Sequence, residues 1–251
     1  MNTTPTSPST RPALPLPAVR SAAMRLAAVW VWLAAGAPVP AASPTSFDDS
    51  FQQDDSGNYT LEGGLWTYDA KRRAFSMAKA LDRNNETMSA LRTKVTLPRA
   101  FTLEAEFTAD GPGNGGLLLL DPATNYYAYA NVGLSKAEGD GWWVVAWIVY
   151  SYPEKNWGYL RQAKKLVTAL TDFTFTLQLS RAPGSDVLEF TVFNSEVGML
   201  ETSVAPGTTG DEGNELLPSW VETLNSFTQA GLRGYDSKGT WSRVKLTERK
   251  K

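Results

Sequence analysis

Cysteine and histidine are both absent from this chain of 251 residues. Without an imidazole or a thiol, the chain cannot carry Ser-His-Asp or Cys-His catalysis, a histidine-ligated zinc or copper site, or a histidine that acts as general acid or base. Any chemistry must therefore use carboxylates, Lys, Tyr or an oxygen-ligated ion. The chain also forms no disulfides, so its fold depends on its core alone.

A marked excess of one charge is also missing. The 24 Lys and Arg residues nearly balance the 26 Asp and Glu residues, which gives a formal net charge of −2. Nucleic-acid binding requires a basic face, so this balance argues against a nucleic-acid partner. No stretch is basic and amphipathic enough to predict a helix that lies on a membrane surface.

A membrane-spanning apolar run is missing as well. The apolar run Leu26–Ala37 is shorter than the ~20 residues that a bilayer span requires. It follows Met24-Arg25 and precedes small residues that end at Ala42. A basic start, a short apolar run and small residues at a cleavage site are typical of a secretory signal peptide. We therefore predict that residues 1–42 are a signal peptide with an N-terminal extension.

Cleavage is expected near Ala41 or Ala42, and Met24 is an alternative start for the chain. The alternative interpretation of this segment is an uncleaved anchor or a disordered tail. After cleavage, residues 43–251 would carry a net charge of −5, because the removed segment holds three Arg residues and no acid. We expect this part to be secreted or periplasmic, to be monomeric, and to have no insertion in a membrane.

Short strand-like runs separated by turn residues fill residues 43–251. Three of them, Gly113–Asp121, Asn125–Val132 and Trp142–Tyr150, follow one another closely and predict an antiparallel meander. Gln52–Gly64 is polar and is predicted to be a loop, and Leu216–Thr228 is the one plausible helix. The pattern predicts a single all-β domain, a two-sheet antiparallel jelly-roll sandwich with at most one short helix.

Three groups of these runs together resemble the concanavalin A-like lectin/glucanase superfamily, including its laminin G-like members. A looser likeness is to the domain of keto-disaccharide hydrolases. The resemblance implies a jelly-roll sandwich with a concave sheet, on which many members bind or cleave polysaccharides. The runs that carry it, in chain order, are Phe47–Phe51 with Leu65-Trp66, Phe101–Phe107 leading into Gly115–Leu117 and Asn125–Tyr127, and Ala230–Tyr235 with Trp241–Leu246.

The meander and the run that follows it are unusually rich in aromatic rings. Rings offer flat apolar area with a polar tip, on which the apolar side of a sugar can lie while Asn131, Gln162 or Arg161 bonds its hydroxyl groups. The alternative interpretation is that most of these rings are core. In the Trp142–Tyr150 run either face could be core. The residues predicted to bind a glycan are Tyr127, Tyr129, Asn131, Trp142 and Trp157, with at least two of the rings exposed.

Two glutamates are the candidate catalytic residues. Glu104 and Glu106 lie two apart on one predicted strand, ~6.5–7 Å between Cα atoms. That separation is compatible with a glycosidase pair, but the Glu-x-Asp-x-x-Glu signature of the laminarinase-type members is absent. The alternative interpretation is a pair of solvated charges that face Arg or Lys across the sheet.

Asp48 and Asp49 are the candidate metal ligands, because they begin an acidic cluster that also holds Asp54 and Asp55. Many sandwiches of the superfamily hold structural calcium, although no EF-hand pattern is present here. No other cofactor is expected. The first hypothesis is a secreted carbohydrate-binding module. The alternatives are a glycan-cleaving enzyme of the same fold and a non-catalytic protein-interaction or surface-structural module.

Overall fold

Two antiparallel sheets make up most of the described part of this computed structural model, which covers residues 46–62, 66–77, 89–152, 155–211, 216, 218–235 and 239–250. The predicted signal peptide and extension, residues 1–42, lie outside the described residues. Residues 42–251 form one compact unit. No helix in the described part of the chain has the length and apolarity of a membrane-crossing segment.

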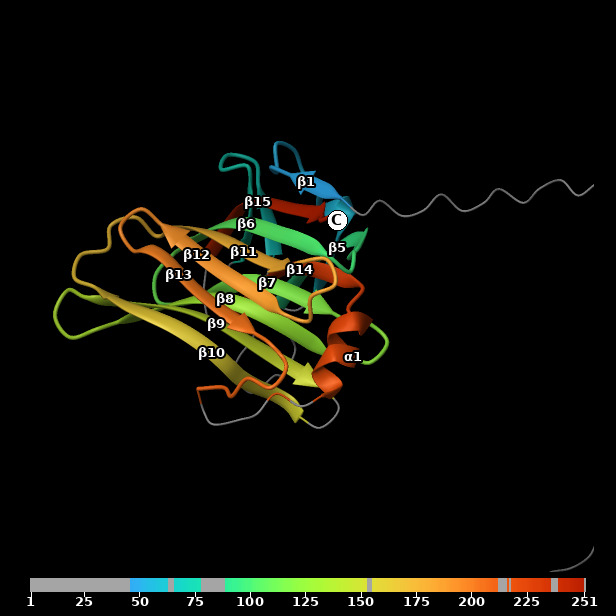
Figure 1. Cartoon of the computed structure of the whole chain (residues 1–251). Coiled ribbons are helices and arrows are strands. Elements are labelled where there is room, and N and C mark those ends of the chain that lie inside the picture. Colours follow the sequence, from blue (N-terminus) through green and yellow to red (C-terminus); the bar gives the residue numbers. More distant parts are fainter. Residues whose placement is uncertain are drawn as a thin grey trace, which may run out of the picture. The chain divides into compact units, whose positions relative to one another are not determined.

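The eight-stranded sheet has the order β13-β12-β11-β6-β15-β4-β3, and β1 pairs with β15 (Figure 1). Its strands are β1 (Phe47–Asp49), β3 (Trp66–Asp69), β4 (Ala74–Met77), β6 (Phe101–Ala109), β11 (Thr174–Arg181), β12 (Leu188–Asn194), β13 (Gly198–Val204) and β15 (Gly239–Glu248).

The seven-stranded sheet has the order β10-β9-β8-β7-β14-β5-β2, so the predicted meander is confirmed as β7, β8 and β9, with β10 added to it. Its strands are β2 (Tyr59–Glu62), β5 (Ser89–Thr96), β7 (Gly113–Leu120), β8 (Tyr127–Lys136), β9 (Trp142–Tyr152), β10 (Lys155–Val167) and β14 (Gln229–Tyr235). The chain thus has the predicted two-sheet antiparallel sandwich.

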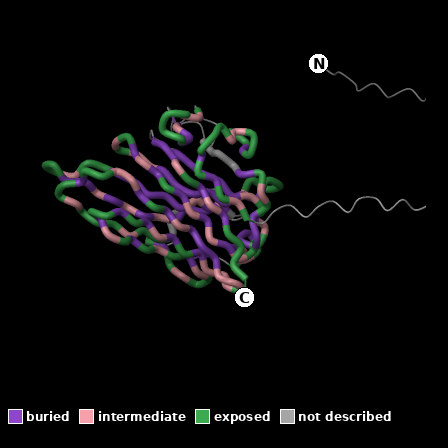
Figure 2. Tube along the Cα trace, turned by 90° about the horizontal axis from the view of Figure 1, so that it is seen from above, coloured by how far each residue is buried: buried purple, intermediate pink, exposed green. Residues whose placement is uncertain are grey.

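Alternate residues of both sheets meet between the layers and form the core. In β6, the apolar positions Phe101, Leu103, Ala105 and Phe107 are all buried, as their period-2 spacing predicts. Each fully buried large side chain contributes about 1.5–3 kcal/mol relative to its exposure to water. Figure 2 shows buried residues along the middle of the strands and exposed residues at the loops.

The prediction that Gln52–Gly64 form a loop is partly wrong. Its last part forms the short strand β2, and Ser56–Asn58 form a single 3-10 turn, η1. Strand β2 pairs with β5, where Leu61 stands opposite Leu91. This pairing is a contact between distant segments, which overrides the weak strand propensity of a polar local sequence.

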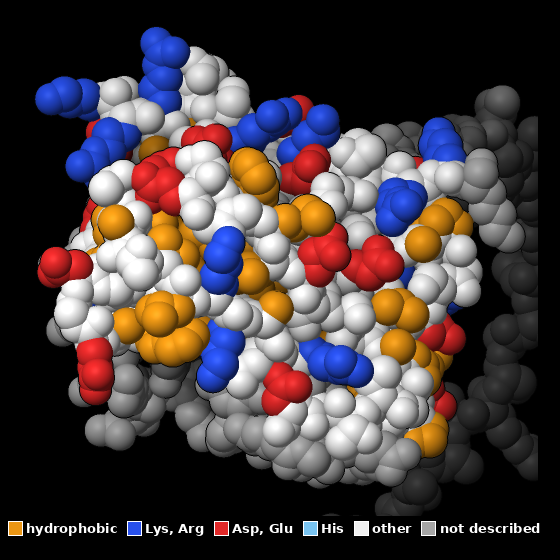
Figure 3. Space-filling view, turned by 60° about the vertical axis from the view of Figure 1, so that its left-hand side comes forward, with side chains coloured by type: hydrophobic (Ala, Val, Ile, Leu, Met, Phe, Trp, Pro, Cys, Tyr) orange, Lys and Arg blue, Asp and Glu red, His pale blue; other side chains and the backbone are white. Residues whose placement is uncertain are grey.

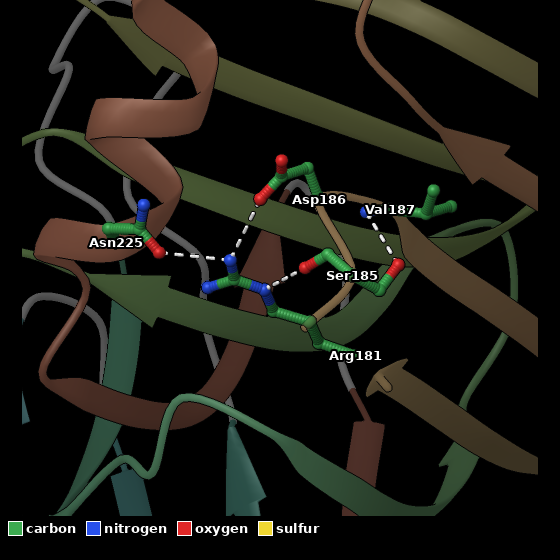
Figure 4. A network of polar contacts seen from close by, with 5 residues as sticks. All are labelled: Arg181, Ser185, Asp186, Val187 and Asn225. Atoms are coloured by element: carbon green, nitrogen blue, oxygen red, sulfur yellow. Dashed lines mark hydrogen bonds and ion pairs between the residues drawn. The ribbon is translucent and has the colours of Figure 1, made fainter. Parts of the chain in front are cut away.

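The helix α1 (Ser219–Ser226) lies at one end of the two layers, as Figure 1 shows. Its Trp220 is fully buried, with its ring centroid 5.4 Å from that of Tyr150 on β9. A polar network also holds the helix (Figure 4), because the buried Arg181 donates to Asn225 Oδ1 over 2.9 Å and to the Ser185 carbonyl over 2.6 Å. The network joins α1 to the β11–β12 hairpin.

Candidate functional site

Strand β8 presents two different faces. Ala128, Ala130 and Val132 are buried in the core between the sheets, which confirms the face predicted from their alternation. Tyr127 and Tyr129 are half-buried on the other face, which points away from the eight-stranded sheet. Two of the predicted rings are therefore accessible from outside the sandwich.

Strand β9 is apolar on both faces, and its pairing with β8 decides which face is core. Ile148 pairs with the core residue Ala130, and directly opposed residues point to the same side of a sheet. The even-numbered residues of β9 therefore lie in the core. Trp143 and Trp147 lie on the outer face with the two tyrosines, where both are half-buried.

Trp142 was predicted to be an exposed ring, and this is wrong. The residue is only 6% exposed, its ring meets the Phe173 ring edge-on with centroids 5.0 Å apart, and Lys136 Nζ lies 4.0 Å from its centroid. Asn131 keeps its predicted place on the outer face, but it is 2% exposed. The side chain of Trp157 lies outside the described residues.

One row of residues crosses five strands on this outer face. The glycine in the row, Gly116, lies between two buried polar side chains. Together with the neighbouring rows, the side chains form a surface that we call the seven-stranded face. The central row, from β14 to β10, is Arg233, Gly116, Asn131, Trp147 and Gln162. The rows beside it add Tyr127, Tyr129, Trp143, Val145 and Lys164.

Two glycines make room for the large side chains of the seven-stranded face. A Cβ on Gly116 would lie 2.2 Å from Asn131 Oδ1 and 2.1 Å from the carbonyl oxygen of Ala130. A Cβ on Gly133 would lie 2.1 Å from the far edge of the Trp147 ring. The Trp147 ring therefore leans from β9 across β8, and Asn131 lies low against β7.

A stack of planar groups runs along β8. The rings of Tyr127 and Tyr129 are nearly parallel, with an interplanar angle of 16° and centroids 5.6 Å apart. The guanidinium carbon of Arg233 lies 3.5 Å from the Tyr129 centroid. The register places Arg233 level with Asn131, on the side of Tyr129 that is opposite to Tyr127. Tyr129 thus lies between Arg233 and Tyr127.

The edge strand β10 contributes two polar side chains to the seven-stranded face. Gln162 and Lys164 are exposed there, and Lys164 Nζ lies 5.3 Å from the centroid of the Trp143 ring. Arg161, predicted as an alternative to Asn131 or Gln162 for bonding sugar hydroxyl groups, pairs with Ile148, which faces the core side of the sheet. It therefore belongs to the opposite face of β10 and does not lie beside the rings of the seven-stranded face.

Glu104 and Glu106 lie on the outer face of the other sheet. Gln178 Nε2 donates to Glu104 Oε1 over 3.2 Å, and the Ser242 hydroxyl donates to Glu106. Arg243 stands opposite Glu106 across the sheet, as the non-catalytic interpretation expects. The two sheets of the sandwich separate these glutamates from the seven-stranded face.

The candidate calcium ligands have protein partners. Asp48 forms an ion pair with Arg243, with both carboxylate oxygens engaged over 3.0 and 3.2 Å, and this contact raises the pKa of Arg243. The buried Asp49 accepts hydrogen bonds from Phe51 N and Tyr59 Oη, each 2.7 Å long. Burial, reinforced by Asp49, raises the pKa of Tyr59.

No group of three or more acidic side chains that could hold a metal ion occurs in the described part of the chain. Calcium binding by Asp48 and Asp49 stays a prediction, and a melting curve recorded with and without a chelator tests it.

Sequence reasoning did not select Arg233, Trp143 or Trp147, which lie on the seven-stranded face. Arg233 was assigned only to a strand that finishes the sheet. Neither its place in the site nor its burial, with 5% exposed, was predicted. The available signal was the Gly231-Leu-Arg-Gly234 pattern, in which glycines flank a charged residue in a strand. Trp143 and Trp147 were recognised as sharing a face, but the sequence did not choose between that face and its opposite.

The surface also carries exposed apolar side chains away from the seven-stranded face. Phe193 is 51% exposed and stands opposite Met199, which is 61% exposed, on the outer face of the eight-stranded sheet. Figure 3 shows one side of the molecule, on which hydrophobic side chains form small patches among charged side chains of both signs. Scattered apolar residues of this kind are normal on a folded protein.

No model of a known protein family matches the sequence, and a comparison with curated proteins returns no match. Solved structures do share the fold. A lectin, UEA-II complexed with galactose, superimposes with a TM-score of 0.54 at 8% identity, over 83% of this chain and 100% of the lectin. Lectin II from Ulex europaeus gives 0.53 at 8% identity, with the same coverage of both chains.

A xylan beta-1,4-xylosidase from Bacillus halodurans also superimposes, with a TM-score of 0.54 at 11% identity. The match covers 82% of this chain and 39% of the xylosidase, so the chain corresponds to less than half of that enzyme. Together these structures show that the chain has the concanavalin A-like sandwich fold implied by its sequence. Since identity is this low, the likeness concerns the fold, and the function has to be argued from the site.

Proposed function

We propose that this protein binds carbohydrate on the seven-stranded face. The observation that carries the proposal is the gathering of half-buried rings on one face: Tyr127, Tyr129, Trp143 and Trp147 come from two adjacent strands and point to the same side. Large rings that stay partly exposed on a folded protein often mark a contact surface. The polar side chains of the same face supply hydrogen-bonding groups beside the rings.

The chemistry of this face suits a sugar better than a wholly apolar ligand. A sugar ring has an apolar side, which can lie on an aromatic ring, and hydroxyl groups around its rim. Gln162 and Lys164 are exposed beside Trp147 and Trp143, where they can meet those hydroxyl groups. The rings lie on paired strands, so their positions are set before a ligand arrives.

The comparisons support the proposal. A lectin complexed with galactose has the same fold, as does part of a xylosidase. Because a signal peptide is predicted, we expect the protein to meet its glycan outside the cytoplasm. The prediction for Trp157 belongs to this proposal too, because β10 borders the seven-stranded face.

Affinity electrophoresis or pull-down with a panel of insoluble and soluble polysaccharides tests the proposal. Tyr127→Ala and Trp147→Ala should each reduce retention by at least about tenfold, given the ~1.4 kcal/mol that a tenfold change represents and the contact area of a ring. Phe193→Ala is the matched control, because it removes an exposed ring from the other sheet. The proposal would be wrong if all three variants were retained by the polysaccharides as strongly as the wild-type protein.

Trp142→Ala is unsuitable as a binding test, because it would empty a core position and unfold part of the sandwich. Release of new reducing ends tests the alternative of glycan cleavage. Among the described side chains of the seven-stranded face none is a carboxylate, so we expect retention without product. Product formed by the wild-type protein would favour an enzyme.

A further inference from the structure

The two outer faces of the sandwich carry different charges. On the eight-stranded sheet, the outward-pointing positions include five acids, on β1, β6, β12 and β13, and two cations on β15. The described outward-pointing side chains of the seven-stranded face include the cations Lys164 and Arg233 and no acid. The acids are Asp48, Glu104, Glu106, Glu189 and Glu201, and the cations beside them are Arg243 and Lys245.

This segregation contrasts with the balance of the whole chain, whose formal net charge is −2. Asp211 does reach β10 from a loop, but its carboxylate accepts a hydrogen bond of 2.7 Å from the backbone N–H of Gln162. The ring-bearing face is therefore the more positive of the two faces in the described part of the protein. A local positive potential attracts anions even when the protein as a whole is acidic.

The two cations lie on opposite sides of the rings. Arg233 is on β14 and Lys164 is on β10, and three strands separate them, so their Cα atoms are on the order of 19 Å apart across the sheet. Tyr129 and Trp147 lie between them on β8 and β9. The Arg233 side chain reaches across β7 to the ring of Tyr129 and is 5% exposed, so its charge adds to the potential of this face, whereas Lys164 is exposed to direct contact. A chain with repeated negative charges can extend along this positive face, which a single sugar residue cannot do.

We propose that the ligand is a linear polyanionic polysaccharide, with carboxylate or sulfate groups along the chain, rather than a neutral glycan. The proposal rests on the proposed function, since it assigns the ligand class of the same face. The exposed Lys164 meets an anionic group beside Trp143. Arg233 lies against the ring of Tyr129, and its charge makes the potential of the seven-stranded face more positive.

Paired polymers that differ only in charge test the ligand class. Polygalacturonate is compared with its fully methyl-esterified form, and dextran sulfate with dextran, by affinity electrophoresis or surface binding. The charged member of at least one pair should bind more tightly, and its binding should weaken with added salt because exposed charges are screened. The carboxylate and sulfate arms identify the source of the charge. Galacturonate monomer should compete far less well than long oligomers.

Two lysine variants separate the site from the net charge. Lys164→Gln should weaken binding of the charged polymer about two- to fivefold, the range expected for one exposed ion pair. Lys245→Gln makes the same change in net charge on the other sheet, and it should have no effect. Equal weakening by both variants would overturn the assignment to the seven-stranded face.

The two proposals fail in different ways. Equal binding of the charged and uncharged polymers, lost in Trp147→Ala, would overturn the polyanion and keep carbohydrate binding. Binding of no polysaccharide at all would overturn both. Preference for a charged polymer that persists unchanged in Lys164→Gln at low salt would also overturn the proposed contact.

Discussion

The guanidinium carbon of Arg233 lies 3.5 Å from the centre of the Tyr129 ring, although the two residues belong to strands that are not neighbours. Arg233 extends from β14 across β7, at the position where β7 carries Gly116. A cation over a ring is worth about 2 kcal/mol when both groups are desolvated, and less when they are exposed. The contact therefore links β14 to β8 across β7, and it fixes the position of the Tyr129 ring.

A double-mutant cycle measures this contact. We expect Arg233→Met, Tyr129→Leu and the double variant to show a coupling of about 1–2 kcal/mol in the free energy of unfolding, because each single change already removes the same contact. Urea unfolding followed by tryptophan fluorescence gives the four free energies. Strictly additive losses would show that the two residues act independently.

Gly116 should tolerate no side chain. Its Cβ would lie 2.1 Å from a backbone oxygen of the adjacent strand, so β7 and β8 would have to separate. We expect Gly116→Ala to lower the free energy of unfolding by at least about 2 kcal/mol, in the range of overpacked sites. Gly57→Ala is the control, because a Cβ there meets nothing within 4 Å. Similar losses in the two variants would contradict the close approach of the strands.

Asp49 should matter for stability much more than its neighbour Asp48. Asp49→Ala removes two hydrogen bonds to a buried carboxylate and leaves the Tyr59 hydroxyl unpaired, at a cost of about 3 kcal/mol or more. Tyr59→Phe removes one of them and should cost about 1–2 kcal/mol. Asp48→Ala breaks only exposed ion pairs and should cost under about 1 kcal/mol. Denaturant titration of the three variants checks this order, and the reverse order would contradict it.

Glu196 should make stability sensitive to acid. Hydrogen bonds from the Thr171 hydroxyl, Thr171 N and Asp172 N lower the pKa of Glu196. Its unfolded pKa is about 4.3, so its contribution is present above that pH and is lost as the pH falls through the lower folded value. The melting temperature of Glu196→Gln should therefore lie below that of the wild type at neutral pH and converge with it in acid.

The control for this experiment is Glu201→Gln, which changes an exposed glutamate on β13. A gap between Glu196→Gln and the wild type that stays constant from neutral to strongly acidic pH would mean that the carboxylate does not act through its charge. In that case the hydrogen bonds from residues 171 and 172 would not distinguish its two protonation states.

The core side of a strand could be predicted from the sequence where the two faces of that strand differ in polarity. In β8, small apolar residues alternate with Tyr and Asn, and this local pattern was enough to identify the core side. In β9, both faces are apolar, so the choice depended on the register with β8, which is a contact between strands. The prediction that Trp142 is exposed failed for this reason.

The burial of Arg233 also depends on distant residues. A single Arg in a strand is usually solvated, and the glycines that flank it in its own segment do not show which residues will cover it. Its place results from the glycine opposite to it on β7 and from the tyrosine on the strand beyond. Arg161 and Trp142 both lie on the core side of their strands, and the two-residue alternation alone could not show this without the register of the paired strand.

Strand β1 pairs with β15, so that Phe47 stands opposite Leu246 and the first and last strands of the sandwich are neighbours. A short peptide linker could therefore join the start of β1 to the end of β15. The chain could then be opened in an exposed turn such as the one at Gly184. Such a circularly permuted protein would keep every sheet contact described above. It would also allow a fusion partner to be attached at the hairpin between β11 and β12 instead of beside β1.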